Sequence, residues 1–140
     1  MGDPIDPTRP ATDKSAWGRA FTLIEDRVDE AYRKRFNNKP ADPISVTYSA
    51  YKSDDDGIPI DNLDEVPVQG RVKFVAEPDS WSTERYESSV VESPTWLEIT
   101  LIADDMIKTI EDFHHIFLEN IRHTKTELDG TKIYCFIMGS

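Results

Sequence analysis

One stretch of the sequence constrains the fold more than any other: residues 95 to 121 carry the densest apolar pattern in the chain. Pro94 ends whatever precedes this stretch. Thr95 and Glu98 have the spacing of a capping box, in which each side chain accepts a hydrogen bond from the other residue's backbone N–H. Apolar side chains then recur at helical spacing. The pattern predicts an amphipathic helix that closes near Glu111.

The period changes from helical to alternating at Phe113, which predicts a strand from there through Ile121. Asp129-Gly130 then predicts a type I′ hairpin with a two-residue loop, followed by a final strand. The register counted from that turn places large apolar side chains on both faces of the hairpin. Two helices cannot easily cover both faces, so either the sheet curls strongly over them or another subunit meets the second face. Its residues are Phe117, Ile121, Tyr134, Phe136 and Met138.

The rest of the chain completes an α+β order of αβββαββ. Alternation and turn residues predict a first helix ending near Arg35 and strands at 44–51 and 68–76, with the status of residues 80–92 ambiguous. We expect a disordered tail over residues 1–13 and a single domain over residues 14–140. The sheet should be curved and mainly antiparallel, with four or five strands and two helices packed on it.

The order of these elements and the acidity of the chain resemble those of small type III secretion chaperones, although no sequence motif carries the resemblance. It implies a homo-oligomer and does not by itself fix a function.

The net charge of −11 is concentrated in two segments, because Lys52–Glu65 and Glu77–Glu98 each hold six acidic residues and one basic residue. Nucleic-acid binders show the opposite pattern, so we expect no nucleic-acid partner. If the segments share one surface, they favour a basic protein partner. The alternative is that the charge only keeps the protein soluble.

The location of the protein is predicted to be cytoplasmic. The chain has a single cysteine, Cys135, which excludes an intramolecular disulfide and fits a reducing compartment. No apolar run approaches the roughly 20 residues of a membrane span, and the N-terminus lacks the pattern of a signal peptide, so no membrane contact is expected.

Candidate chemistry is sparse in the sequence. His114 or His115, with Tyr134, are the weak candidates for polar groups in a ligand cavity. Both histidines fall on the predicted strand, where neighbours point to opposite faces, so they cannot chelate one ion without a bulge. Cys135 lies in an apolar strand and is predicted to be buried and structural. We expect no cofactor.

The acidic loop after Lys52 resembles part of a calcium loop around Gly57. It fails at both ends of the EF-hand pattern, because Lys52 and Leu63 stand where acids are required. We therefore expect no metal. The weak candidates for an irregular calcium site are Asp54, Asp56, Asp61 and Asp64.

These observations lead to a non-enzymatic protein-interaction domain, acidic and dimeric, as the first hypothesis. The alternative is a protein with a small-molecule pocket or a small enzyme, which would use His114 or His115 in a cavity between the sheet and a helix.

Overall fold

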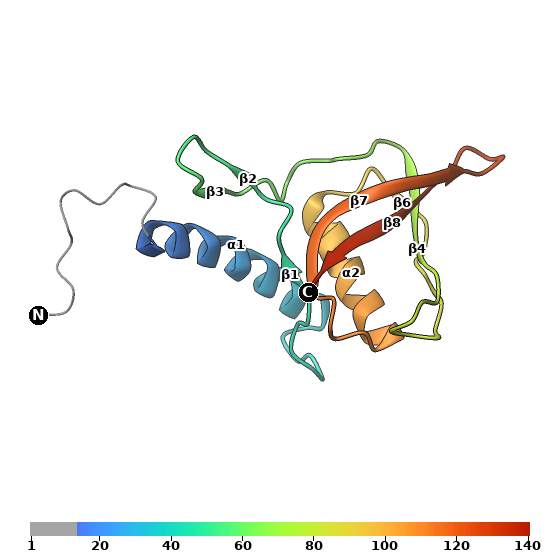
Figure 1. Cartoon of the computed structure of the whole chain (residues 1–140), viewed down its shortest axis with the longest axis horizontal. Helices are drawn as coiled ribbons and strands as arrows, with labels where there is room; N and C mark the ends of the chain where they lie inside the picture. The colour runs from blue at the N-terminus through green and yellow to red at the C-terminus, as the bar shows by residue number, and fades with distance from the viewer. Residues whose placement is uncertain (1–13) are drawn as a thin grey trace, which may run out of the picture.

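The computed structural model describes residues 14–140, and the predicted tail over residues 1–13 lies outside the described residues. The described chain forms the predicted α+β fold, with a curved sheet over helix α2 and helix α1 extending to one side (Figure 1). The elements are α1 (Lys14–Arg35), β1 (Thr47–Tyr48), β2 (Lys52–Ser53), β3 (Pro59–Ile60), β4 (Arg71–Ala76), β5 (Tyr86–Glu87), β6 (Val91–Glu92), α2 (Trp96–Ile110), β7 (Phe117–Thr126) and β8 (Lys132–Gly139).

Helix α2 has the boundaries that its sequence predicts. The Thr95 side chain accepts a hydrogen bond from the Glu98 N–H at 3.2 Å, and the Glu98 carboxylate accepts one from the Thr95 N–H at 3.1 Å, which completes the capping box. Glu111 closes the helix in the left-handed conformation, at φ 57°. No helix in the described part of the chain has the length and apolar composition needed to span a membrane.

The main sheet is mixed, with the strand order β1-β7-β8-β4-β5 and with β6 also on β4. β1 pairs with β7 and β4 pairs with β8 in parallel, whereas the remaining pairs are antiparallel. The strand predicted over residues 44–51 is reduced to β1. The predicted loop after it contains the small β2–β3 hairpin, and the ambiguous residues 80–92 form β5 and β6.

The β7–β8 hairpin differs from the predicted register. Gly130 N–H donates to the Glu127 carbonyl, and only Gly130 in this turn has a positive φ, so the loop is a three-residue type I turn with a glycine bulge rather than a type I′ turn. Two further irregularities in β7, between Leu118 and Asn120 and between His123 and Lys125, shift the pairing again. Leu118 therefore pairs with Met138 and shares a face with it, whereas the register counted from a two-residue loop places these two side chains on opposite faces.

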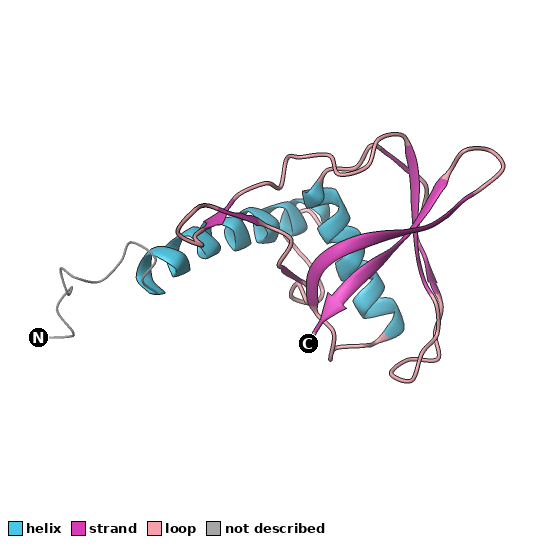
Figure 2. Cartoon of the chain, turned by 45° about the horizontal axis from the view of Figure 1, so that its top comes forward, coloured by secondary structure: helices cyan, strands magenta, loops and turns pink. Residues whose placement is uncertain are grey.

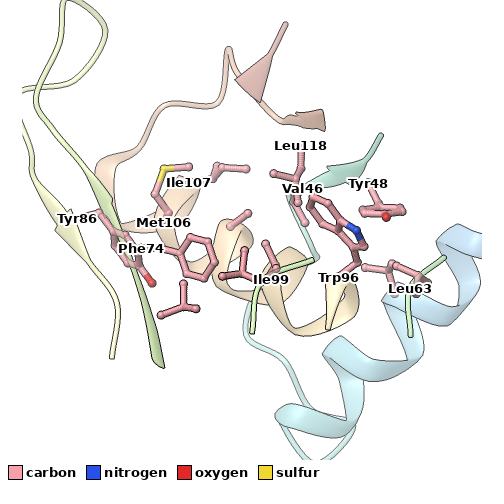
Figure 3. Packing of buried hydrophobic residues seen from close by; sticks show 14 of the residues in the cluster. Val46, Tyr48, Leu63, Phe74, Tyr86, Trp96, Ile99, Met106, Ile107 and Leu118 are labelled. Atoms are coloured by element: carbon pink, nitrogen blue, oxygen red, sulfur yellow. The ribbon is translucent and has the colours of Figure 1, made fainter. Parts of the chain in front are cut away.

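The core fills the space between the sheet and α2, with a contribution from the C-terminal half of α1. At one end Trp96 packs beside Tyr48 and Leu63, and at the other Phe74 and Tyr86 lie over Met106 (Figure 3). All six of these large side chains are less than one tenth exposed. Burial on this scale is the main force that holds the sheet on the helix.

A buried carboxylate ties the chain before β1 to α2. One oxygen of Asp104 accepts the backbone N–H groups of Ser45 and Val46 at 2.6 and 3.1 Å. The other lies 2.9 Å from the Lys108 ammonium, which also contacts the Tyr32 hydroxyl. Since Asp104 is only 3% exposed, these partners supply the hydrogen bonds and the countercharge that a buried carboxylate requires.

Replacing Trp96 with alanine should lower the free energy of unfolding by about 3–5 kcal/mol, because a core aromatic is lost and a cavity remains. Trp81→Ala is the matched control: Trp81 is 57% exposed, so its loss should cost less than about 1 kcal/mol. Chemical denaturation of the two variants measures both values. Equal losses would mean that Trp96 does not anchor the core.

Candidate functional site

The sheet opens between β4 and β8. Their parallel pairing covers three residue pairs and ends at Phe74–Tyr134. Beyond that point residues 75–76 turn to β5, while residues 135–139 follow β7. Figure 1 and Figure 2 both show β4 and β8 diverging, with the C-terminal half of α2 behind the space between them. We call the space between residues 75–77 and residues 135–139 the opening.

Two features keep the strands apart beyond the Phe74–Tyr134 pair. Pro78 lacks an N–H and cannot extend β4 along β8. The irregularities in β7 bend and twist the hairpin that carries β8. In the part of the chain that the structure describes, residues 135–139 pair with β7 alone, so one edge of β8 remains a free strand edge.

A cavity of about 410 Å³ lies on the helix side of the opening. Met106 and Ile110 of α2 and Phe136 and Met138 of β8 give it an apolar lining. Acidic and aromatic groups stand around it. We call this the inner cavity; its other lining residues are Ala76, Glu77, Asp79, Trp81, Asp112, His115, Arg122 and Cys135.

A tight turn after β4 forms one lip of the inner cavity. The Asp79 carboxylate accepts the backbone N–H groups of Trp81 and Ser82 at 2.8 and 3.0 Å. The Ser82 hydroxyl donates to the carbonyl of Ile110 at 2.6 Å, which fixes the turn to the last turn of α2. Trp81 is thereby held at the mouth of the cavity although more than half of its surface is exposed.

The two predicted histidines lie in the loop after α2 and not on a strand, since β7 begins only at Phe117. Asp112 is the physical reason: one of its carboxylate oxygens accepts the His114 N–H at 3.1 Å, and the other lies 2.9 Å from Nδ1 of His115. This turn replaces the start of the predicted strand. Both rings then contact Trp81, at centroid distances of 5.0 and 5.2 Å.

The structure brings only His115 of the predicted ligand groups to the inner cavity. His114 contacts Trp81 with tilted rings and does not line the cavity, and Tyr134 packs near His123 and Phe74. Cys135, which the sequence predicts to be buried, is half-buried and borders the opening.

The predicted interface residues are mostly used within the chain. Ile121, Tyr134, Phe136 and Met138 pack against the core, and Phe136 stacks on Phe74 with ring centroids 4.9 Å apart. Phe117 is 36% exposed. Phe136 and Met138 remain accessible from the inner cavity, which is a narrower surface than the face predicted from the sequence.

The opposite side of the opening holds a second cavity of about 450 Å³. Lys73 and Val75 face it, and they alternate along β4 with Phe74, which faces the core. We call this the outer cavity. Its lining residues are Lys73, Val75, Glu77, Arg85, Glu87, Arg122, Thr124, Lys125, Glu127, Ile133 and Cys135, so it shares Glu77, Arg122 and Cys135 with the inner cavity.

Ion pairs order one wall of the outer cavity. Glu87 binds both Lys73 and Arg85, and Arg85 also reaches Glu77 at 3.3 Å. The hydrogen bond from Arg85, followed by that from Lys73, lowers the pKa of Glu87 from 4.5 to about 2.

The weak calcium candidates do not converge. Asp54 accepts the N–H groups of Asp56 and Ile58 within the β2–β3 turn, whereas Asp61 and Asp64 both bind Arg27. Among the described residues no group of three acidic, histidine or cysteine side chains is placed to hold a metal ion.

The two acidic segments are apart at their turns but meet at the start of α2, where the Trp96 N–H donates to the Glu65 carbonyl at 2.9 Å. The β2–β3 hairpin, with Asp54 to Asp56, lies at the opposite end of the molecule from the turn that follows β4 (Figure 1, Figure 2). The single negative face considered from the sequence stays a prediction.

Comparison of the chain with protein-family models, curated proteins and solved structures finds no significant match.

The pKa of Glu87 gives a direct test of the outer wall. A lowered pKa means that the pairing of Glu87 stabilises the fold fully above pH 4.5 and is lost as the pH falls toward 2. NMR titration of the Glu87 carboxyl should give an apparent pKa of about 2 in the wild type.

The Arg85→Gln variant should raise that pKa toward 4.5, since the strongest hydrogen-bond donor is removed. Arg33→Gln on α1 is the matched control, because Arg33 pairs with Asp29 and not with Glu87. A wild-type Glu87 that titrates near 4.5 would show that the wall is not formed in solution.

Proposed function

We propose that this chain is a non-enzymatic interaction domain, which binds an extended segment of a partner protein by adding it to the sheet at the opening. One observation carries the proposal: β8 continues for five residues after its pairing with β4 ends, and its free edge borders a preformed cavity. A free edge offers backbone donors and acceptors in the spacing that an incoming strand requires.

The inner cavity supports this proposal through its lining. Alternate side chains of an extended segment point to one side, and here they would enter a space with Met106, Ile110 and Phe136 along it. The lip formed by Asp79 to Ser82 is already fixed to α2, so little order has to be gained on binding.

The net charge of the partner protein is a separate question from the fit of its segment in the opening. With a net charge of −11, the chain attracts partners of net positive charge at long range, and this raises the rate of encounter. A basic protein partner is therefore part of the proposal. The homodimer suggested by the sequence, formed through the apolar face of the β7–β8 hairpin, stays a prediction.

A neutral peptide tests the backbone interaction. An acetylated peptide of about eight residues, alternating serine and valine, should bind with a Kd of roughly 10–100 µM. Fluorescence anisotropy measures the affinity. Amide hydrogen exchange locates the peptide, because residues 135–139 should be unprotected in the free protein and become protected when the peptide binds. Light scattering of the free chain shows whether a second copy already occupies the opening.

Backbone methylation provides the control. The N–H groups of alternate residues in a strand point to opposite edges, so the peptide is methylated either at its serines or at its valines. One of the two methylated peptides should bind at least about tenfold more weakly than the unmethylated peptide, because its hydrogen bonds to β8 are removed while its side chains are kept. Equal binding by all three peptides would contradict strand addition. The protein variant Met138→Asp should weaken binding, whereas Leu128→Asp at the exposed hairpin tip should not.

A second candidate function is a small-molecule site that uses His115. The observation in its favour is the Asp112–His115 pair beside the inner cavity, in which a buried carboxylate orients the imidazole through Nδ1. Such a pair leaves Nε2 as the ring nitrogen for a bound molecule and is suited to general-base or nucleophilic chemistry.

Hydrolysis of p-nitrophenyl acetate tests this second candidate. If His115 is an activated base or nucleophile, the chain should accelerate the reaction and His115→Gln should remove at least about nine tenths of the excess rate. His123→Gln is the control, because His123 is exposed and lies outside the inner cavity. Equal loss in both variants would mean that the activity is that of any surface histidine.

A further inference from the structure

The charges around the outer cavity are unevenly satisfied. The wall of Glu77, Glu87, Lys73 and Arg85 is paired within itself. Arg122 and Lys125 of β7 have no ion pair among the described residues. Glu127, which follows β7 at the hairpin turn and lines the same cavity, is the one acidic lining residue that is also unpaired. In a strongly acidic chain, this leaves one net positive charge at a concave surface.

Arg122 lies beside the start of the free edge of β8. It pairs with Cys135 across β7 and β8, at the residue where the free edge of β8 begins, and it lines both cavities. A guanidinium group at this point can bind a carboxylate through two parallel hydrogen bonds. Lys125 lies further along the same strand and lines the same cavity.

The geometry of an added strand decides which side chains meet these cations. Successive side chains of an extended segment point to opposite faces of the sheet. In the opening, one set would therefore point toward α2 and the apolar inner cavity. The other set would point away from α2 into the outer cavity, toward Arg122 and Lys125.

We infer that the opening selects segments in which apolar residues alternate with acidic residues, and that Arg122, supported by Lys125, recognises the carboxylates. This inference rests on the proposed strand addition and names the sequence class of the bound segment. It applies to the segment alone: at 0.15 M salt charges are screened beyond about 8 Å, so a partner that is basic overall can carry a locally acidic segment.

Three peptides of one length test the inference, at fixed ionic strength. Each alternates valine with a second residue, which is serine, glutamate or lysine. The glutamate peptide should bind about fivefold more tightly than the serine peptide, and the lysine peptide should bind more weakly than both. In the double variant Arg122→Gln, Lys125→Gln, the glutamate peptide should fall to the affinity of the serine peptide, whose own affinity should not change.

Arg19→Gln with Lys34→Gln is the matched control, because it removes the same two positive charges from the exposed surface of α1, outside both cavities. It should preserve the preference for glutamate. Circular dichroism of both double variants shows that the fold is retained, as expected for exposed residues.

The outcomes separate the two proposals. If the serine peptide binds and is sensitive to backbone methylation, but glutamate gives no gain or lysine binds best, the inference is overturned while strand addition stands. If no peptide binds, strand addition itself fails and the inference falls with it. If the control double variant also loses the preference for glutamate, the effect comes from net charge, and the role assigned to Arg122 is overturned.

Discussion

The arrangement depends on a parallel ladder of only three residue pairs, Val72–Phe74 with Lys132–Tyr134, which joins the two halves of the sheet. So short a ladder contributes few hydrogen bonds. The halves stay together because both pack on α2, and because Phe74 of one half stacks on Phe136 of the other. Burial of apolar surface against the helix thus replaces strand pairing as the force that closes the sheet. Where that burial ends, toward the C-terminal end of α2, the strands separate.

Local sequence chemistry predicts the helix at the centre of the fold. The capping box at Thr95 and Glu98 and the apolar stripe are both local signals, which can be recognised without knowing where the rest of the chain lies. The α+β class follows from the same kind of pattern. The hairpin was predicted in kind and wrong in register, because Asp129-Gly130 is compatible with both a two-residue and a three-residue loop. Each irregularity in β7 then moved the register again, and neither leaves a clear mark in the alternation.

The candidate site was predicted only in part, through His115, Phe136 and Met138, and the reason is physical. The opening exists because two strands distant in sequence stop pairing at a particular residue, which is a property of twist and packing rather than of any local pattern. Asp112 is the one local signal that was missed. An aspartate two residues before His114 can form a turn through its side chain, and this competes with the strand that alternation favours.

A free strand edge inside a protein poses a problem of selectivity, since it pairs as readily with a wrong chain as with a right one. Here the edge of β8 is recessed: α2 lies behind it, β4 stands opposite, and the lip that carries Trp81 borders the cavity beside it. In the proposed strand addition, a single extended segment would reach such an edge and a flat sheet would not. The charged residues on both sides of the opening, Glu77 and Arg122 among them, add a cost for any segment whose charges do not match. The early end of the β4–β8 ladder weakens the sheet, and it also restricts which segments can be added to the sheet there.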